Sequence, residues 1–441
     1  MHQFTKSLTR VLAIQNFGSS GSKFVHALLD NHPNILAIPS LYMISFYGFW
    51  PTDIKRKRDD VTNEFIQTHE YWFDPNGYAP WGTNKMGPNR DETVYVERDI
   101  FVKNLAEVLD YKEKVTRKLF FQALYVAYAM SYDRSLNLDA DQYVMLYPYH
   151  TARATVATEL TRDFPDTRFI HCFREPIQTL GSTYKIGSTR WSGFAVVSPA
   201  KRYTTAEVEL NIFLRDTYIA NIDPYTIHGI SPIIPEYKSR SRALQLEELV
   251  KCPKDILTKL CNWIDVPWDD ALLEATYNGK LWWNRPESAQ VTGFSNKPLS
   301  RKHADVFCRF DLYRLNVLLA KTKSKMGYSS VLWQPSAIER ILFFMSLLLP
   351  LKMELLSVFP SKFSLHATFQ FINRVPENMQ AIARNRSLRR VGLWQAKREL
   401  LHYSTNWLLL TPVRSYVNVR RIFFQAMSQL SEQKPVIVEH L

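Results

Sequence analysis

A short apolar run leads directly into a glycine- and serine-rich loop, and a helical pattern follows at once. The run is Val11 to Asn16, and the helical pattern ends at Asn31-His32-Pro33. The loop between them contains Gly18, Ser19, Ser20, Gly21, Ser22 and Lys23. In such a strand-loop-helix, free backbone N–H groups and the positive end of the helix point at the same spot, which makes it an anion site. The same pattern also fits a tight turn whose serines only cap the helix.

The loop differs from the nucleotide loop of metal-dependent NTPases. That loop has the pattern GxxxxGK followed by serine or threonine, whose hydroxyl holds magnesium. Here Gly18 and Gly21 stand closer together, and Phe24 follows Lys23. We therefore predict an anion loop without a bound metal.

Strand-like and helix-like stretches alternate through the first 330 residues. Besides the first run, we expect strands at 35–38, 143–147, 168–173 and 243–246, and helices around 98–110, 118–131, 151–163 and 205–220. This alternation predicts a P-loop-like α/β fold, in which helices cover both faces of a parallel sheet. Segment 40–95 is aromatic and poorly periodic, and we expect it to be an insertion over one edge of the sheet.

Beyond about residue 330 the pattern changes to helices alone. Residues 331–441 hold 14 Lys and Arg against 6 Glu and no Asp, so +8 of the chain's net charge of +13 lies there. We therefore expect a nucleotide-binding domain over 1–330 and a basic helical extension over 331–441. A basic and apolar surface suits an anionic membrane, and it suits helices packed back onto the main domain equally well.

The excess of positive charge favours an anionic partner. Nucleotides, sulfated or phosphorylated substrates and acidic membrane surfaces all fit this description. Nucleic acid does not, because the charge is concentrated beside apolar helices and no recognised nucleic-acid-binding module is present.

The cysteines and the apolar runs favour a reducing compartment. The four cysteines form no CxxC pair and have no histidine at metal-ligand spacing, so neither a disulfide framework nor a zinc site is expected. The apolar run 11–14 is too short for a signal-peptide core, and polar residues and a proline interrupt the run 341–359. We expect a cytoplasmic protein, either free or peripheral on the inner face of a membrane.

A second motif combines an arginine with a serine. The segment 164–176 reads FPDTRFIHCFREP, in which a buried strand ends at Arg174, and Ser182 follows on the next helix. Open α/β sheets bind their ligands at the carboxyl ends of the strands. An arginine and a hydroxyl together bind phosphate well, so we expect a phosphate site at Arg174 and Ser182.

The two motifs, in this order, resemble the PAPS-dependent sulfotransferases, whose donor is 3'-phosphoadenosine 5'-phosphosulfate (PAPS). The resemblance is to the bacterial type and, more distantly, to the animal protein-tyrosine sulfotransferases, and it spans about residues 9 to 328. It includes Leu28-Leu29-Asp30-Asn31-His32-Pro33 after the loop, the segment 246–250 with 260–268, and the segment 293–300. It implies that residues 18–23 bind the 5'-phosphosulfate and that Arg174 and Ser182 bind the 3'-phosphate. It also implies that Lys297 lies in a loop that closes over the nucleotide.

The sequence departs from the family pattern at residues that matter for chemistry. Ser19 replaces the basic residue of the loop, and Lys23 supplies a positive charge from a shifted position. The catalytic glutamate of the protein-tyrosine sulfotransferases is missing, because the chain reads Ile38-Pro39-Ser40-Leu41 after the first helix. The segment 146–150 keeps the histidine of a related motif but lacks its lysine.

Sulfuryl transfer needs a base for the acceptor proton and a positive group for the leaving oxygen. We assign the base to His150 at the end of an expected strand, because imidazole titrates near working pH. Glu97, Glu70 and His26 are the alternatives. Lys23 is the expected group for the leaving oxygen.

The resulting prediction is a sulfotransferase that moves a sulfuryl group from PAPS to a hydroxyl or an amine, without a metal. The acceptor is not specified: aromatic residues in segment 40–95 and the pair Trp282-Trp283 fit a glycan, a lipid or a phenol, although most also fit a protein core. A nucleoside-phosphate kinase of P-loop type is the alternative enzyme. A catalytically inactive relative that binds a nucleotide or a membrane is the alternative outside enzymes.

Overall fold

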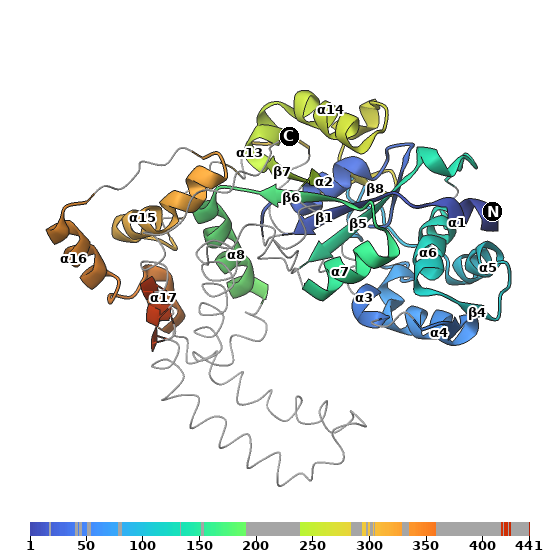
Figure 1. The fold of residues 1–441 in the computed structure, drawn as a ribbon, viewed down its shortest axis with the longest axis horizontal. Helices are drawn as coiled ribbons and strands as arrows, with labels where there is room; N and C mark the ends of the chain where they lie inside the picture. The colour runs from blue at the N-terminus through green and yellow to red at the C-terminus, as the bar shows by residue number, and fades with distance from the viewer. Residues whose placement is uncertain are drawn as a thin grey trace, which may run out of the picture. The chain divides into compact units, whose positions relative to one another are not determined.

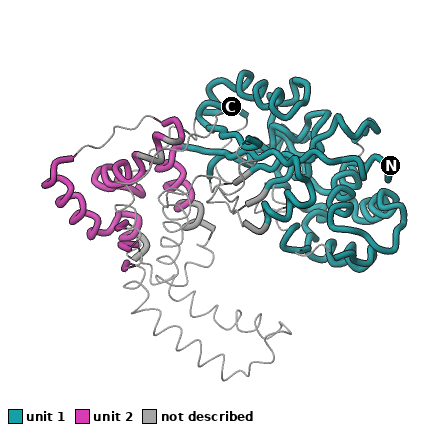
Figure 2. The backbone as a smooth tube through the Cα atoms, in the orientation of Figure 1, with its two compact units in different colours: residues 1–174, 223–300, 437–441 teal, residues 175–222, 301–436 magenta. Residues whose placement is uncertain are grey.

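The computed structural model describes residues 1–16, 19–39, 43, 46–50, 54–77, 82–132, 134–150, 154–190, 239–283, 293–296, 299, 303, 305–328, 335–358, 416–417, 419–421, 423–424 and 441. The chain forms two compact units (Figure 2). The first contains residues 1–174, 223–300 and 437–441, and the second contains 175–222 and 301–436.

The first unit is built on a five-stranded parallel sheet with the strand order β2-β5-β1-β6-β7 (Figure 1). The strands are β1 (Val11–Asn16), β2 (Ile35–Ala37), β5 (Val144–His150), β6 (Arg168–Phe173) and β7 (Ser241–Gln245). All but β7, which contains Arg242, are mainly apolar. Parallel strands connected through helices need such runs because both faces of the sheet are buried. The predicted α/β class is confirmed.

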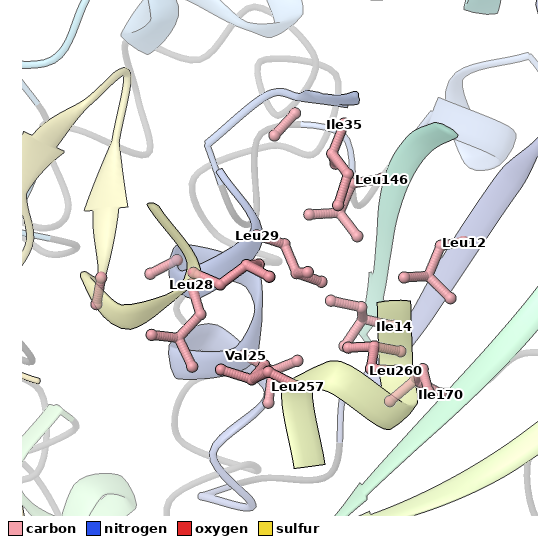
Figure 3. Packing of buried hydrophobic residues seen from close by; sticks show 14 of the residues in the cluster. Leu12, Ile14, Val25, Leu28, Leu29, Ile35, Leu146, Ile170, Leu257 and Leu260 are labelled. Carbon is pink, nitrogen blue, oxygen red and sulfur yellow. The ribbon is translucent and has the colours of Figure 1, made fainter. Parts of the chain in front are cut away.

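Helices pack on both faces of this sheet. On one face, α2 (Ser22–Leu29) and α14 (Pro253–Ile264) contribute Val25, Leu28, Leu257 and Leu260 to the core cluster shown in Figure 3. On the other face lie α6 (Arg117–Ser131) and α7 (Ala154–Asp163). There Phe121 of α6 packs against Tyr147 of β5, with ring centroids 5.5 Å apart. Successive residues of a strand point to opposite faces, so Leu146 joins the first core and Tyr147 the second.

Smaller elements complete the first unit. They are α1 (His2–Ser7), α3 (Phe46–Phe49), β3 (Arg56–Lys57), α4 (Arg58–Thr68), η1 (Glu70–Trp72), α5 (Arg98–Val108), β4 (Lys114–Val115), η3 (Ala140–Gln142), α13 (Leu246–Lys251), η5 (Asp270–Leu273), β8 (Thr276–Tyr277) and β9 (Lys280–Leu281).

Among the described residues outside segment 40–95, each predicted strand and helix is found, with ends that differ by up to three residues. The expected strand 168–173 is β6 residue for residue, whereas β5 extends to His150 and β7 begins at Ser241. Segment 40–95 contains the regular helix α4, although it was expected to be poorly periodic. Val61 and Phe65 are buried there at helical spacing, but Asp59, Asp60 and Glu64 obscure the apolar pattern. The helix expected at 205–220 lies outside the described residues.

The described part of the second unit is helical. It contains α8 (Pro176–Arg190), α15 (Arg309–Lys325), α16 (Ala337–Ser346) and α17 (Lys352–Val358). Helix α16 begins with a capping box between Ser336 and Glu339. The division into units falls after Arg174 and again after Ser300, and the expected domain boundary at residue 330 stays a prediction. In the part of the chain that the structure describes, no helix is long and apolar enough to cross a membrane.

Candidate functional site

Three neighbouring strands end side by side at one edge of the sheet. Asn16, the last residue of β1, is in register with His150, the last residue of β5. On the other side β1 pairs with β6, which ends at Phe173 and is followed directly by Arg174. After β1 the chain continues to β2 at one end of the sheet, whereas after β6 it continues to β7 at the opposite end. This divergence makes the β1–β6 edge a topological switch point, where open α/β sheets bind ligands.

The loop after β1 has the backbone of an anion site. Ser19 (φ 58°) and Gly21 (φ 92°) both adopt left-handed conformations, which turn successive N–H groups toward one side. The Oγ of Ser19 is buried and has no hydrogen-bond partner among the described residues. A buried, unsatisfied hydroxyl is costly unless a ligand or water meets it. The loop therefore offers both N–H groups and a hydroxyl to an anion.

Gly21 is required by both its conformation and its neighbours. A Cβ at this position would lie 2.7 Å from Cδ1 of Leu246, the first residue of α13. The carbonyl of Gly21 accepts hydrogen bonds from the N–H groups of Phe24 (2.8 Å) and Val25 (3.1 Å), which starts helix α2. The segment after β7 thus packs directly against the anion loop.

The predicted closing loop meets the helix that follows the anion loop. Phe24 and Phe294 pack edge to face, with ring centroids 5.3 Å apart. The hydroxyl of Tyr277 donates to the carbonyl of Lys23 at 3.2 Å. Gly18 and Lys297, both predicted to bind the nucleotide, lie outside the described residues.

Asp30 and His32, which follow helix α2, form hydrogen bonds with other parts of the first unit. Oδ2 of Asp30 accepts hydrogen bonds from Oγ1 of Thr276 (3.1 Å) and the N–H of Gly279 (3.2 Å). Burial raises the pKa of Asp30 to about 7, and the hydrogen bond from Gly279 opposes this shift. Nε2 of His32 lies 2.9 Å from the carbonyl of Pro267. These contacts fasten the end of α2 to the segment 267–279.

The two predicted 3'-phosphate ligands are both buried. Arg174 is 4% exposed and ends the first unit, whereas Ser182 is 6% exposed and lies on α8 in the second. Oγ of Ser182 lies 3.5 Å from Nε2 of His303. Sequence reasoning did not identify His303, since no periodicity or motif links it to Ser182.

The candidate bases occupy different surroundings. The backbone of His150 lies at the end of β5 beside the start of the anion loop. His26 is fully buried, and neither of its ring nitrogens has a hydrogen-bond partner among the described residues. Burial lowers its pKa to about 3. Glu97 and Glu70 are exposed at the start of helical segments.

Much of the predicted aromatic acceptor region is protein core. Phe46, Tyr47, Trp50 and Trp72 are at most 4% exposed. The hydroxyl of Tyr47 donates to Asp163, whose carboxylate also accepts from the buried guanidinium of Arg117. This buried network was not predicted, because no local spacing links Arg117 to Asp163, which is 46 residues away in the sequence. Tyr42 and Trp81 lie outside the described residues.

The tryptophan pair connects segment 40–95 to the β8–β9 hairpin. Trp282 is buried in the core cluster, in agreement with the prediction that it packs in a protein core. Nε1 of Trp283 donates to the carbonyl of Gly87 at 2.7 Å, and the guanidinium of Arg90 lies 5.5 Å from its ring centroid. Trp283 is therefore held on the side of the hairpin that faces the insertion.

No group of three or more His, Cys, Asp or Glu side chains that could hold a metal ion occurs within the described ranges.

Comparisons with known proteins give one match by sequence and several by structure. A family model described as the sulfotransferase family matches residues 17–270. No curated protein matches the chain in sequence. A sulfotransferase domain from the curacin biosynthetic pathway is similar in structure with a TM-score of 0.41 and 12% identity, covering 74% of this chain and 99% of that domain. Sulfotransferase STF9 from Mycobacterium avium is similar with a TM-score of 0.32 and 13% identity, covering 62% of this chain and 68% of that one.

Proposed function

Because the chain belongs to the sulfotransferase family, we propose that it transfers a sulfuryl group from PAPS to a hydroxyl or an amine. The observation that carries this proposal is the edge of the sheet at which β5, β1 and β6 end together. There the anion loop follows β1 and Arg174 follows β6. Two separate anion-binding features at one edge suit a nucleotide with phosphate groups at both its 5' and 3' positions.

The residues present fit such a donor. The loop 18–23 would hold the 5'-phosphosulfate, and the left-handed residues at Ser19 and Gly21 together with the unsatisfied Ser19 hydroxyl support this role. Arg174 and Ser182 would hold the 3'-phosphate. Lys297 would close over the nucleotide. The contact between Phe24 and Phe294 supports this role, because it joins the segment before Lys297 to helix α2.

The donor supplies an activated sulfuryl group, and the protein supplies a base and a positive charge. His150 removes the proton from the acceptor hydroxyl or amine as the new bond to sulfur forms. Lys23 stabilises the negative charge that develops on the phosphate oxygen that leaves. The register between His150 and Asn16 supports this division of roles, since it brings the end of β5 beside the loop that contains Lys23.

The acceptor is a hydroxyl- or amine-bearing glycan, lipid or small molecule that contacts segment 40–95. The most deeply buried aromatic side chains of that segment are structural, so Trp283 and the part-exposed residues Tyr71 and Phe73 are better candidates for acceptor contacts. Aromatic faces bind sugar rings, phenols and acyl chains alike.

We also propose that the C-terminal extension binds anionic membrane surfaces peripherally. On α16 and the turn after it, Ile338, Ile341, Leu342, Met345, Leu348 and Leu349 recur at helical spacing and are 37% to 71% exposed. We call these six residues the α16 stripe. Apolar side chains on such a stripe insert at the headgroup boundary, while a segment with net charge +8 is attracted to anionic lipid.

The direct test is to incubate the protein with sulfur-labelled PAPS and with glycan, lipid and phenol extracts. Label should appear in one acceptor class, and EDTA should leave the rate unchanged. The kinase alternative predicts instead that phosphoryl groups move from ATP and that EDTA stops the reaction. Binding of the nucleotide without turnover of any extract would favour the catalytically inactive relative.

A further inference from the structure

A histidine lies beside the serine that is predicted to hold the 3'-phosphate. Both residues belong to the second unit, where Oγ of Ser182 is 3.5 Å from Nε2 of His303. Each of the two residues is 6% exposed. The separation is at the long end of hydrogen bonding, so a small movement of either group upon ligand binding completes the bond.

Gly181 allows the imidazole to approach α8. A Cβ on Gly181 would lie 2.5 Å from Cγ and 2.9 Å from Nδ1 of His303. Because Cγ is fixed close to the backbone, the ring cannot avoid such a methyl group by rotating its far end. The glycine before Ser182 thus creates the space that the imidazole fills.

Further contacts fix the position of His303. Its carbonyl accepts hydrogen bonds from the N–H groups of Val306 (2.9 Å) and Phe307 (2.8 Å), which form the turn before α15. Lys323 on α15 pairs with Glu175, the residue before α8, at 2.8 Å. Helix α8, which carries Ser182, and helix α15, which follows the turn containing His303, are therefore joined by an ion pair.

We propose that His303 is a positioning residue that directs the hydroxyl proton of Ser182 toward the 3'-phosphate. A serine hydroxyl has one proton to donate and two lone pairs that accept. An imidazole whose Nε2 carries the hydrogen donates to Oγ and leaves the serine proton available to a phosphate oxygen. Without this donor, the hydroxyl can turn its proton elsewhere. The inference rests on the proposed function, because it assumes that Ser182 binds the 3'-phosphate.

Calorimetry with adenosine 3',5'-bisphosphate and AMP tests this role, because AMP lacks the 3'-phosphate. His303→Ala should weaken binding of the bisphosphate by about 10- to 150-fold, the scale of one hydrogen bond to a charged group, and leave AMP unchanged. His303→Gln should restore most of the affinity, since its amide also donates. Gly181→Ala should reproduce the effect of His303→Ala, whereas Gly48→Ala, where a Cβ meets nothing within 4 Å, should bind as the parent does.

A double substitution separates positioning from general stability. In a Ser182→Ala background, His303→Ala should cause no further loss for the bisphosphate, because the group it orients is gone. Equal losses for AMP and the bisphosphate, or a full additional loss in the double variant, would overturn the role of His303. A parent protein that binds both nucleotides equally would overturn the proposed function and this inference with it. A parent that prefers the bisphosphate and a His303→Ala variant that keeps the full preference would overturn the inference alone.

Discussion

Phe24 and Phe294 pack edge to face with their ring centroids 5.3 Å apart, although they are far apart in the sequence. Phe24 follows Lys23 at the start of α2, and Phe294 precedes Lys297 in the predicted closing loop. Both rings also pack against the core cluster that lies between the sheet and α14. The contact therefore anchors two predicted donor-binding segments to one hydrophobic core.

Gly21→Ala should weaken nucleotide binding. The substitution places a Cβ 2.7 Å from Cδ1 of Leu246 and forces alanine into a left-handed conformation at φ 92°. The left-handed conformation alone costs about 1–2 kcal/mol for a residue other than glycine. We expect the dissociation constant for adenosine 3',5'-bisphosphate, measured by calorimetry, to rise about tenfold.

Leu246→Ala in the Gly21→Ala background is the matched control. It removes the steric conflict and leaves the backbone strain, so it should recover only part of the affinity. Unchanged binding by the Gly21→Ala protein would show that the loop does not need its observed backbone to bind the nucleotide.

His150→Ala should reduce turnover by about 10²- to 10⁴-fold, the usual range for the loss of a general base. A histidine base acts only when neutral, so the parent rate should rise with pH through about 6 to 7. Lys23→Ala should lower turnover by a similar factor at every pH, because a lysine stays charged across this range. A His150→Ala enzyme with the activity and pH profile of the parent would transfer the role of base to Glu97 or Glu70.

His26→Leu should make the protein more resistant to acid without abolishing turnover. Burial lowers the pKa of His26 to about 3 in the folded protein, whereas a histidine in the unfolded chain titrates near 6.5. Below about pH 6.5 the unfolded state therefore binds a proton that the folded state does not. The free energy of unfolding thus decreases as the pH is lowered. Removing His26 should reduce the loss in unfolding free energy between pH 7 and pH 5 by about 2 kcal/mol, measured by urea denaturation.

The buried His171 and His69 provide the internal reference for this experiment. Burial lowers the pKa of His171 to about 3 and that of His69 to about 4, so both contribute the same acid sensitivity to the parent and the variant. An equal decline of stability in both proteins would contradict the assignment of His26 as a buried neutral imidazole. Loss of turnover in a folded His26→Leu protein would instead support His26 as the catalytic base.

Ile341→Glu combined with Leu342→Glu should reduce binding to anionic membranes. The two residues lie in the middle of the α16 stripe and are 62% and 63% exposed. We expect co-sedimentation with vesicles of phosphatidylglycerol and phosphatidylcholine to fall about tenfold or more, since two apolar side chains no longer insert. Added salt should weaken binding of the parent, because it screens the attraction between charges.

Leu138→Glu combined with Ile100→Glu is the matched control, because it adds the same charge at exposed apolar positions of the first unit. It should sediment with vesicles nearly as well as the parent. Equal losses in both double variants would indicate an effect of net charge alone. Unchanged vesicle binding by the α16 variant, together with a change in its oligomeric state, would identify the stripe as a contact between copies of the chain.

The sequence predicted the features that depend on local pattern. Strands β1 and β6 are apolar runs bounded by turn residues, and they were found at their expected positions. Helix α4 was missed because its acidic residues mask the buried face, and β7 was displaced because Arg242 interrupts its apolar run. The contacts between Phe24 and Phe294 and between Ser182 and His303 join distant segments, so no local spacing indicates them.

Recognition of a 3'-phosphate distinguishes PAPS from other nucleotide donors, and calorimetry compares adenosine 3',5'-bisphosphate with AMP for this reason. The parent should bind the bisphosphate more tightly than AMP. Arg174→Ala should weaken the bisphosphate by about 2–4 kcal/mol, the scale for removing one partner of a buried charged contact, and leave AMP binding unchanged. Equal affinity of the parent for the two nucleotides would contradict the assignment of PAPS as the donor.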